Sequence, residues 1–303
     1  MDVSVIIVNY NTSRLIVDCV ESILQQTQGV SYEVIIVDNN SEADFEEKIS
    51  KRIPDNFSSL FHFLSLPENI GFGRANNEGL KIATGRNIFF LNPDTVLINN
   101  AIKILSDFLD FHPKAGACGG NLYNADMQPV HSFRRFLPGI FCEFNELLNN
   151  RPQRLLFGKN SSHNHTSHTL KVGFITGADL MVKRSVLSTT GGFSKDFFLY
   201  YEETDLCYRI KKKGWEIYSV PEAKILHLES KSFSATEAYE SEFKTQMLEK
   251  SRNIYYRRNI NNFTKEISNL IYSMFLKSRA HIITNTRKKE YYLKRIKYFR
   301  TSK

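Results

Sequence analysis

Cysteine is scarce in this 303-residue sequence, and it contains no long hydrophobic run. The four cysteines lie far apart without a Cys-x-x-Cys pair, so we expect neither a disulfide framework nor a structural zinc site, and a reducing cytosol fits. No apolar stretch reaches the roughly 18 residues that a membrane-spanning helix requires. The N-terminus is apolar but lacks a basic region and a small-residue cleavage site, which predicts a strand and not a signal peptide.

Two common nucleotide-binding signatures are also absent. No GxGxxG follows the first apolar run, and GxxxxGK[ST] occurs nowhere, so classical dinucleotide and P-loop sites lose their main support. Apolar residues make up 42% and charged residues 24% of the chain. This ordinary globular usage excludes fibrous and wholly disordered classes.

The net charge of +8 is unevenly distributed. Residues 252–303 contain 14 Lys and Arg against two Glu, a net charge of +12, which leaves −4 on the first 251 residues. This distribution predicts a body that handles small molecules and a tail that meets a polyanion. That polyanion is either nucleic acid or an anionic membrane surface.

Short β-branched runs alternate with helix-length amphipathic segments from the start of the chain. Because apolar strands separated by helices form parallel sheets covered on both faces, the pattern predicts a doubly wound α/β fold. Residues 149–169 read as a polar loop, and the chain from about 236 reads as helical and basic. The expected strands are 3–8, 33–37, 60–64, 87–91, 116–123, 217–220 and 224–227. A first helix is expected after Thr12 or Ser13, with Leu15, Ile16, Cys19, Ile23 and Leu24 on one face. The later expected helices are 72–83, ended by Gly85 as the C′ residue, 99–111 and 203–213.

Polar residues follow three of these strands where each one ends. In an open parallel sheet the ligand lies beyond the carboxyl ends of the strands. A loop cap explains any one such group, but three together favour a ligand crevice. The three groups are Asn9-Tyr10-Asn11, Asp38-Asn39-Asn40 and Asn92-Pro93-Asp94.

These motifs occur in the order seen in family 2 glycosyltransferases, which the sequence resembles over about residues 3–230. The resemblance rests on VSVIIVNYN, EVIIVDNNS, ENIGFGRANNEGL, FFLNPDT, GADLMVKRSVLSTTGGF and FFLYYEETDLCYRIKKKGW. It implies an inverting enzyme with a GT-A fold, most similar to rhamnosyltransferase-like members of bacterial polysaccharide assembly. The expected organisation is a GT-A domain at 1–235 and a basic helical extension at 236–303. Within the domain we expect a nucleotide-binding half at about 1–120 and an acceptor half at about 121–235.

The resemblance implies a set of donor-binding residues. Asp38 matches the acid that accepts the imino N–H of uracil or thymine, although on its own it is equally well explained as a helix cap. Arg74 and Asn77 lie one helical turn apart and would face the diphosphate, although Arg74 alone reads as a solvated surface residue. The remaining members are Asn9, Tyr10, Asn11, Asn69, Gly71 and Asn92.

A metal site is implied by the same resemblance. Asn92-Pro93-Asp94 stands where the family often has Asp-x-Asp, so Asp94 alone carries the charge, and contact of Asn92 with the ion is left open. His227 matches the late histidine that completes the site. A carboxylate with few other protein ligands suits Mg²⁺ or Mn²⁺. The alternative is a simple Asn-Pro-Asp turn.

The general base is expected where an aromatic run meets the start of a helix. Glu203 occupies the position of the second family acid, and the aromatic run before it could raise its pKa by desolvation. The helix dipole alone would also favour acids here. Asp205 and Arg209, four residues apart, read as a structural ion pair. The acceptor side is assigned to Gly177, Ala178, Asp179 and Glu202.

The implied reaction moves a rhamnose-like sugar or a hexose from a dTDP- or UDP-sugar to a glycan or lipid-linked acceptor. We expect a cytoplasmic enzyme that sits peripherally at the inner face of the cell membrane and has no nucleic-acid partner. The helix at 263–283 is amphipathic and either packs on the body or meets the membrane. In 287–303, Tyr291, Tyr292, Ile296, Tyr298 and Phe299 are expected among lipid headgroups, with Lys and Arg on anionic lipid.

Three alternatives remain at this point. A sugar nucleotidyltransferase needs a glycine-rich N-terminal phosphate loop, which VNYNTSRL does not provide. A nucleic-acid-binding protein would use the segment KKEYYLKRIKYFR, which interleaves bases with aromatic residues. A sugar-binding protein without catalysis would have lost Glu203 or Asp94, and both are present.

Overall fold

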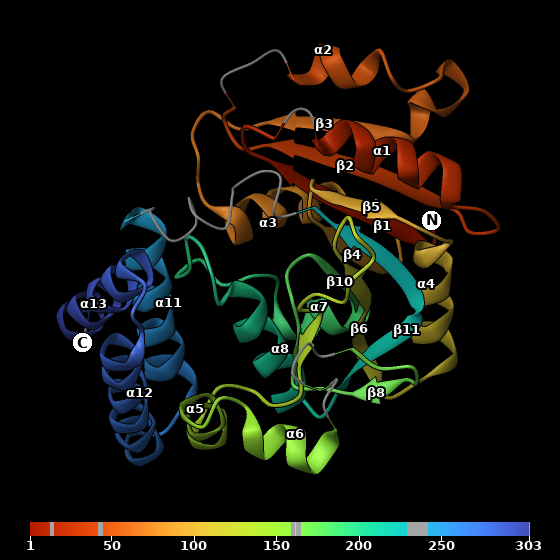
Figure 1. The fold of residues 1–303 in the computed structure, drawn as a ribbon. Coiled ribbons are helices and arrows are strands. Elements are labelled where there is room, and N and C mark those ends of the chain that lie inside the picture. The colour runs from red at the N-terminus through yellow and green to blue at the C-terminus, as the bar shows by residue number, and fades with distance from the viewer. Residues whose placement is uncertain (13–14, 42–44, 159–160, 162–164, 229–241, 303) are drawn as a thin grey trace.

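The computed structural model describes residues 1–12, 15–41, 45–158, 161, 165–228 and 242–302 (Figure 1). A nine-stranded sheet forms its centre. Its strands are β1 (Val3–Asn9), β2 (Tyr32–Asp38), β3 (Phe61–Ser65), β4 (Asn87–Leu91), β5 (Thr95–Leu97), β6 (Ala115–Tyr123), β8 (Leu170–Lys171), β10 (Asp179–Lys183) and β11 (Glu216–His227). A separate two-stranded sheet pairs β7 (Phe133–Arg134) with β9 (Phe174–Ile175).

The large sheet is mixed but mainly parallel. Its order is β3-β2-β1-β4-β10-β6-β11-β5, with β8 paired to β11. Strands β1 to β4 run parallel, whereas β10 is antiparallel to both of its neighbours and β5 is antiparallel to β11. The predicted class, an α/β fold of GT-A type with C-terminal helices, is confirmed.

Helices cover both faces of the sheet. Alternate residues of β1 enter different cores: Ile7 packs with residues of α1 and α4, and Ile6 packs with residues of α3 and α8. Every residue of β1, β2 and β4 is buried, as their unbroken apolar runs predict. The helices of this part are α1 (Leu15–Gln26), α2 (Phe45–Ser50), α3 (Phe72–Ile82), α4 (Ala101–Phe111), α7 (Arg184–Thr190) and α8 (Glu202–Lys212), with a short 3₁₀ helix at Asp55–Leu60.

Three local expectations are corrected. Helix α3 ends at Ile82, and Gly85 has no positive φ; a Cβ there would lie 2.4 Å from the backbone nitrogen of Ser4, so close approach and not a C′ turn requires glycine. The two expected strands at 217–220 and 224–227 form the single strand β11, with a register irregularity between Ser219 and Lys224. The polar segment 149–169 contains the helix α6 (Arg151–Phe157).

The basic C-terminal region is helical where the structure describes it. It forms α11 (Glu242–Asn259), α12 (Asn262–Ile282) and α13 (Thr286–Thr301), while residues 236–241 lie outside the described residues. Figure 1 shows the three helices together at one side of the molecule, with α5 (Ile140–Leu147) beside the lower end of α12. No helix in the described part of the chain is long and apolar enough to span a bilayer.

A buried arginine joins these helices to the body. Arg252 on α11 is 1% exposed, and its Nη2 donates to Glu143 Oε1 of α5 at 2.7 Å. Its Nη1 donates to Asn269 Oδ1 of α12 at 2.9 Å. The guanidinium lies 4.2 Å from the ring centroid of Tyr256 and 3.8 Å from that of Tyr272. Charge, hydrogen bonds and ring contacts of one side chain therefore connect three helices.

The expectation that the aromatic residues of 287–303 reach lipid is wrong for two of them. Tyr298 and Phe299 on α13 are buried, and Phe299 packs against Tyr272. Arg295 Nε donates to the buried carboxylate of Glu249 at 2.6 Å. This ion pair compensates the charge of an arginine inside the helical bundle. Helix α12 divides its apolar residues: Phe275 and Leu276 are buried, and four are exposed, namely Phe263, Leu270, Met274 and Ile282.

Candidate active site

The ends of β1 and β2 carry a polar cluster. Asn9 and Asp38 are partners in the parallel ladder, and Asn9 Nδ2 donates to Asp38 Oδ1 at 2.8 Å. Ser41 Oγ donates to the same carboxylate oxygen at 2.6 Å and accepts from Asn9 Nδ2 at 2.9 Å and from the backbone N–H of Asn11 at 3.0 Å. Tyr10 projects from the cluster and is 47% exposed. The structure thus brings four predicted donor residues together and adds Ser41, which lies within the quoted EVIIVDNNS but was not singled out.

A second cluster positions the start of α3. Asn39 Nδ2 donates to Asn69 Oδ1 at 2.9 Å, and that oxygen also accepts from the backbone N–H of Gly71 at 3.0 Å. Asn39 Oδ1 accepts from the backbone N–H of Ile70 at 3.0 Å. At Gly71, φ is 88° and a Cβ would lie 2.4 Å from Phe198 O. The glycine is therefore needed for the close approach of the 198 segment, and Asn39, predicted only as part of the polar group after the second strand, positions the start of α3.

Two residues predicted to face the diphosphate hold a neighbouring loop. Asn77 Nδ2 donates to Phe193 O at 2.8 Å, and Asn77 Oδ1 accepts from the Phe193 backbone N–H at 2.9 Å. Arg74 donates through Nε and Nη2 to Lys195 O. Both groups of the Asn77 amide bond the backbone of Phe193, so its observed contacts position this loop, and contact with a diphosphate stays a prediction. Arg74 remains exposed at the site edge.

The predicted metal residues are brought together by sheet register. β5 follows Asp94 directly and pairs antiparallel with the end of β11, where His227 lies opposite Thr95. His227 Nε2 is 3.4 Å from Asp94 Oδ1, and both side chains are mostly buried, at 11% and 12% exposed. The backbone N–H of Leu228 donates to Asp94 O at 2.8 Å and fixes this end of the pair.

A divalent ion is compatible with this pair but would take few ligands from the protein. Within the described residues no group of three or more His, Cys, Asp or Glu side chains could hold a metal. Asp94 and His227 offer one carboxylate and one imidazole, which fits an ion that takes its remaining ligands from water and substrate phosphate. The backbone of Asn92 bonds within the protein: its N–H donates to Ala178 O at 3.0 Å, and its carbonyl accepts from Thr95 Oγ1 at 2.7 Å.

Two strained tyrosines place the predicted base at the start of α8. Tyr200 and Tyr201 have φ values of 69° and 67°, a left-handed conformation that costs about 1–3 kcal/mol per non-glycine residue. Glu202 and Glu203 follow in the first turn of α8. Consecutive residues with this conformation are unusual and are typical of functional sites.

Burial perturbs both glutamates. It raises the pKa of Glu203, whose Oε1 accepts a hydrogen bond from Thr204 Oγ1 at 2.9 Å. Burial, together with the charge of Glu203, raises the pKa of Glu202 well above its usual range. Glu202 is only 5% exposed, and its Oε2 has no hydrogen-bond partner among the described residues. Two adjacent carboxyl groups are thus held where ionisation is costly, as expected for acid–base chemistry.

Gly177 links the base to the end of β4. A Cβ at Gly177 would lie 3.6 Å from Phe72 and 4.0 Å from the Glu203 side chain. The next residue, Ala178, accepts the backbone N–H of Asn92. The first turns of α3 and α8 and the carboxyl end of β4 therefore meet at one place, close to the predicted metal pair.

Asp179 does not lie on an accessible acceptor surface as predicted. It is fully buried, and its Oδ2 accepts the backbone N–H of Gly120 at 2.6 Å. Burial raises the pKa of its carboxyl well above the usual range. The reason is the place of β10 between β4 and β6, where its residues from Asp179 to Val182 are all buried. Ala178 is also buried, so Gly177 alone of this stretch reaches the site.

The predicted ion pair on α8 is confirmed. Arg209 Nε donates to Asp205 Oδ2 at 2.8 Å, and Asp205 is fully buried. Asn259 Nδ2 of α11 donates to the other carboxylate oxygen at 2.8 Å. The pair therefore also connects the helix that carries Glu203 to the C-terminal bundle.

Comparison with known proteins agrees with this architecture. The family model for glycosyl transferase family 2 matches residues 4–188. The chain belongs to glycosyl transferase family 2.

Curated relatives match at low identity. The N-acetylglucosaminyl-diphospho-decaprenol L-rhamnosyltransferase of Mycobacterium tuberculosis is 26% identical over 210 residues, which cover 64% of this chain and 66% of the relative. The low-salt glycan biosynthesis hexosyltransferase Agl10 of Haloferax volcanii is 24% identical over 71% of this chain and 64% of its own length. The chain thus spans just under two thirds of these relatives.

Solved structures share the fold. The mannosyltransferase PcManGT from Pyrobaculum calidifontis, solved in complex with GDP-Man and Mn²⁺, superposes with a TM-score of 0.61 at 16% identity and covers 99% of this chain and 85% of its own. Residues 1–349 of TarS from S. aureus give a TM-score of 0.53 at 16% identity, covering 100% of this chain and 90% of TarS 1–349. At this identity the likeness concerns the fold alone.

Proposed function

We propose that this glycosyltransferase works by a single displacement with inversion and that Glu203 is its general base. The Glu203 carboxylate takes the proton of an acceptor hydroxyl while that oxygen bonds to the anomeric carbon of the donor sugar. The bond from that carbon to the phosphate oxygen breaks at the same time, and a nucleoside diphosphate leaves. The observation that carries the proposal is the position of Glu203: a partly buried carboxyl with a raised pKa, beside Gly177, at the meeting point of α3, α8 and β4.

The cluster at the ends of β1 and β2 is the proposed base pocket of the donor site. Asp38 has a carboxylate fixed by Asn9 and Ser41, a suitable acceptor for the imino N–H of uracil or thymine. Both bases present the same edge, so dTDP- and UDP-sugars fit equally. The relative named as a rhamnosyltransferase favours a rhamnose-like sugar, and the hexosyltransferase keeps UDP-hexoses as candidates.

Mg²⁺ or Mn²⁺ is the proposed cofactor, held by Asp94 and His227. When bound there, the ion supplies positive charge that stabilises the departing diphosphate. The Mn²⁺ of the archaeal mannosyltransferase with the same fold supports this assignment.

The proposed acceptor is a lipid-linked or glycan hydroxyl in cell-surface polysaccharide synthesis. The decaprenol-linked substrate in the name of the mycobacterial relative supports a lipid carrier. We therefore propose a cytoplasmic enzyme held at the inner face of the membrane through anionic lipid. The exposed bases of α13, Arg287, Lys288, Lys289, Lys297 and Arg300, are suited to this contact.

The test of the function is a panel of dTDP- and UDP-sugars, assayed for hydrolysis and for transfer with and without Mn²⁺. We expect release of a nucleoside diphosphate, whereas a sugar nucleotidyltransferase would release inorganic diphosphate instead. Glu203→Gln should lower kcat by about 10²–10⁴-fold with nearly unchanged donor affinity. Glu222→Gln, at an exposed glutamate on β11, is the matched control. Near wild-type turnover of the Glu203 variant would remove this residue from the mechanism.

A further inference from the structure

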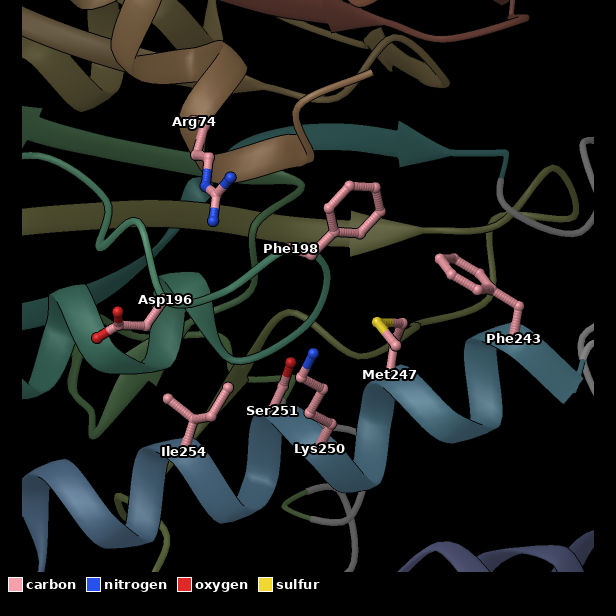
Figure 2. A pocket seen from close by; sticks show the side chains of 8 residues that line it. All are labelled: Arg74, Asp196, Phe198, Phe243, Met247, Lys250, Ser251 and Ile254. Atoms are coloured by element: carbon pink, nitrogen blue, oxygen red, sulfur yellow. The ribbon is translucent and has the colours of Figure 1, made fainter. Parts of the chain in front are cut away.

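A pocket of about 290 Å³ lies between α3, the segment before α8, and α11. Figure 2 shows α11 along one side of it and Arg74 of α3 pointing in from the opposite side. Its lining residues are Arg74, Asp196, Phe198, Phe243, Met247, Lys250, Ser251 and Ile254. Five of the eight come from one face of α11, so the C-terminal bundle supplies most of one wall.

The charge of this pocket is positive. Arg74 and Lys250 reach it from opposite sides, and the Arg74 guanidinium donates hydrogen bonds to a carbonyl, Lys195 O. The carboxylate of Asp196 is already paired with Arg258. Two cations that face a cavity whose one carboxylate already has a partner favour an anion with several oxygens, such as a phosphate.

The rest of the lining is apolar. Phe198 and Phe243 meet edge to face, with ring centroids 6.0 Å apart at 87°. Met247 and Ile254 continue the apolar surface along α11, and Phe243 is 52% exposed. A free inorganic phosphate would leave this surface unused, whereas a phosphate esterified to a hydrocarbon would cover it.

The pocket is linked to the proposed base through the segment before α8. Phe198 lies five residues before Glu203, and its carbonyl accepts the backbone N–H of Phe72 at 3.1 Å. Phe72 also borders Gly177, which contacts Glu203. Ser251 Oγ donates to Leu199 O at 2.7 Å and fixes the intervening segment to α11. A ligand in the pocket would therefore contact the segment that leads into the helix of Glu203.

We propose that this pocket binds the phosphate and the adjoining hydrocarbon of a lipid diphosphate acceptor, with Lys250 and Phe243 as its specificity residues. The proposal rests on the function proposed above and names the part of the acceptor that the C-terminal bundle recognises. It assigns Lys250 to phosphate charge and Phe243 to the first carbons of the chain.

The test uses the full chain and farnesyl diphosphate as a water-soluble probe, with inorganic diphosphate and UDP as comparison ligands, measured by isothermal titration calorimetry. Lys250→Gln should raise the Kd for farnesyl diphosphate about tenfold relative to the Kd for UDP. Phe243→Ala should weaken farnesyl diphosphate several-fold and leave inorganic diphosphate unchanged. Lys212→Gln, at an exposed lysine at the end of α8, is the control for a general charge effect.

Several results would overturn the inference. The first is that the wild type does not bind farnesyl diphosphate. The second is that Lys250→Gln binds farnesyl diphosphate as tightly as the wild type does. The third is that Lys250→Gln loses as much affinity for UDP as for farnesyl diphosphate. The last result would mark the pocket as part of the donor site. Failure of the proposed function is visible separately, as an absence of sugar-nucleotide turnover by a wild-type protein that still binds farnesyl diphosphate.

Discussion

The side chain of Glu203 lies where a negative charge is costly, yet the proposed role of general base requires the charged carboxylate. A general base works as the carboxylate, so the rate should rise with pH as Glu203 loses its proton. Because burial raises the pKa of Glu203, the midpoint of this increase in rate should lie at a pH above the ordinary glutamate pKa of about 4.3. The measurement is kcat against pH at saturating donor and acceptor.

A comparison of two variants tests whether the acid limb, the low-pH part of the profile where kcat increases with pH, belongs to Glu203. Glu203→Gln should keep only a low rate without that limb, while Glu222→Gln should keep the wild-type profile. An acid limb at the ordinary glutamate value would contradict the role of burial. The same limb in the Glu203 variant would assign the titration to another group.

Asp94 and His227 form a pair whose single replacement should affect the ion and the donor together. Asp94→Asn and His227→Gln should each weaken binding of Mn²⁺ in the presence of UDP, because the ion would bridge protein and diphosphate. Calorimetry of UDP with and without Mn²⁺ measures this directly, independently of turnover. A transferase rate unchanged by chelation with EDTA would contradict the metal assignment.

At the scale of elements, α11 is the junction between the catalytic body and the C-terminal helices. Its Arg252 pairs with Glu143 of α5, its Glu249 accepts from Arg295 of α13, and its Asn259 bonds Asp205 of α8. Helix α11 also forms the wall of the pocket in Figure 2. Stability of the bundle and shape of the pocket are therefore linked through one helix.

Removing Arg252 should be strongly destabilising. Arg252→Ala leaves the carboxyl of Glu143 buried without its counter-charge and opens a cavity between aromatic rings. Breaking a buried ion pair from one side costs about 3–5 kcal/mol. Urea unfolding monitored by circular dichroism measures the loss, and Arg258→Ala, at a half-exposed arginine on the same helix, is the control. A loss below about 1 kcal/mol would contradict the structural role given to Arg252.

At the scale of the whole molecule, positive charge collects on the C-terminal helices while several of their aromatic residues, among them Tyr272, Tyr298 and Phe299, are buried. Deletion of α13 would expose Glu249 and Tyr272, so charge substitutions test membrane contact better than truncation. The exposed apolar residues of α12 and those of the α5–α6 region, Phe141, Phe144, Leu148, Leu155, Leu156 and Phe157, add surface that lipid could cover.

The membrane proposal predicts a charge-dependent affinity. Replacing Arg287, Lys288 and Lys289 together by Gln should weaken binding to anionic liposomes on the order of 100-fold, since each base contributes about 1 kcal/mol near the surface. Flotation with anionic and neutral liposomes at low and high salt measures it. The control replaces three exposed lysines of the body by Gln, namely Lys114, Lys212 and Lys213. Equal flotation of both variants, or no preference for anionic lipid, would contradict the proposal.

The sequence by itself determined the parts of this protein that depend on neighbours in the chain. Unbroken apolar runs predicted β1, β2 and β4, and polar residues directly after them predicted the cluster of Asn9 and Asp38, because parallel strands end at one edge. The spacing of four residues on one helix was enough to predict the ion pair of Asp205 and Arg209. Motif resemblance added the family, which residue chemistry alone did not supply.

Only the tertiary structure decided the contacts between distant segments. The antiparallel insertion of β10 buries Asp179, and the register of β5 on β11 places His227 against Asp94. Arg252 and Glu143, 109 positions apart, make a basic helix part of the core. The composition of a basic, aromatic helix such as α13 is the same whether the helix binds lipid or packs on its own protein, so composition does not distinguish the two. Its burial depends on whether buried partners such as Glu249 are present to pair its charge, and those partners lie elsewhere in the chain.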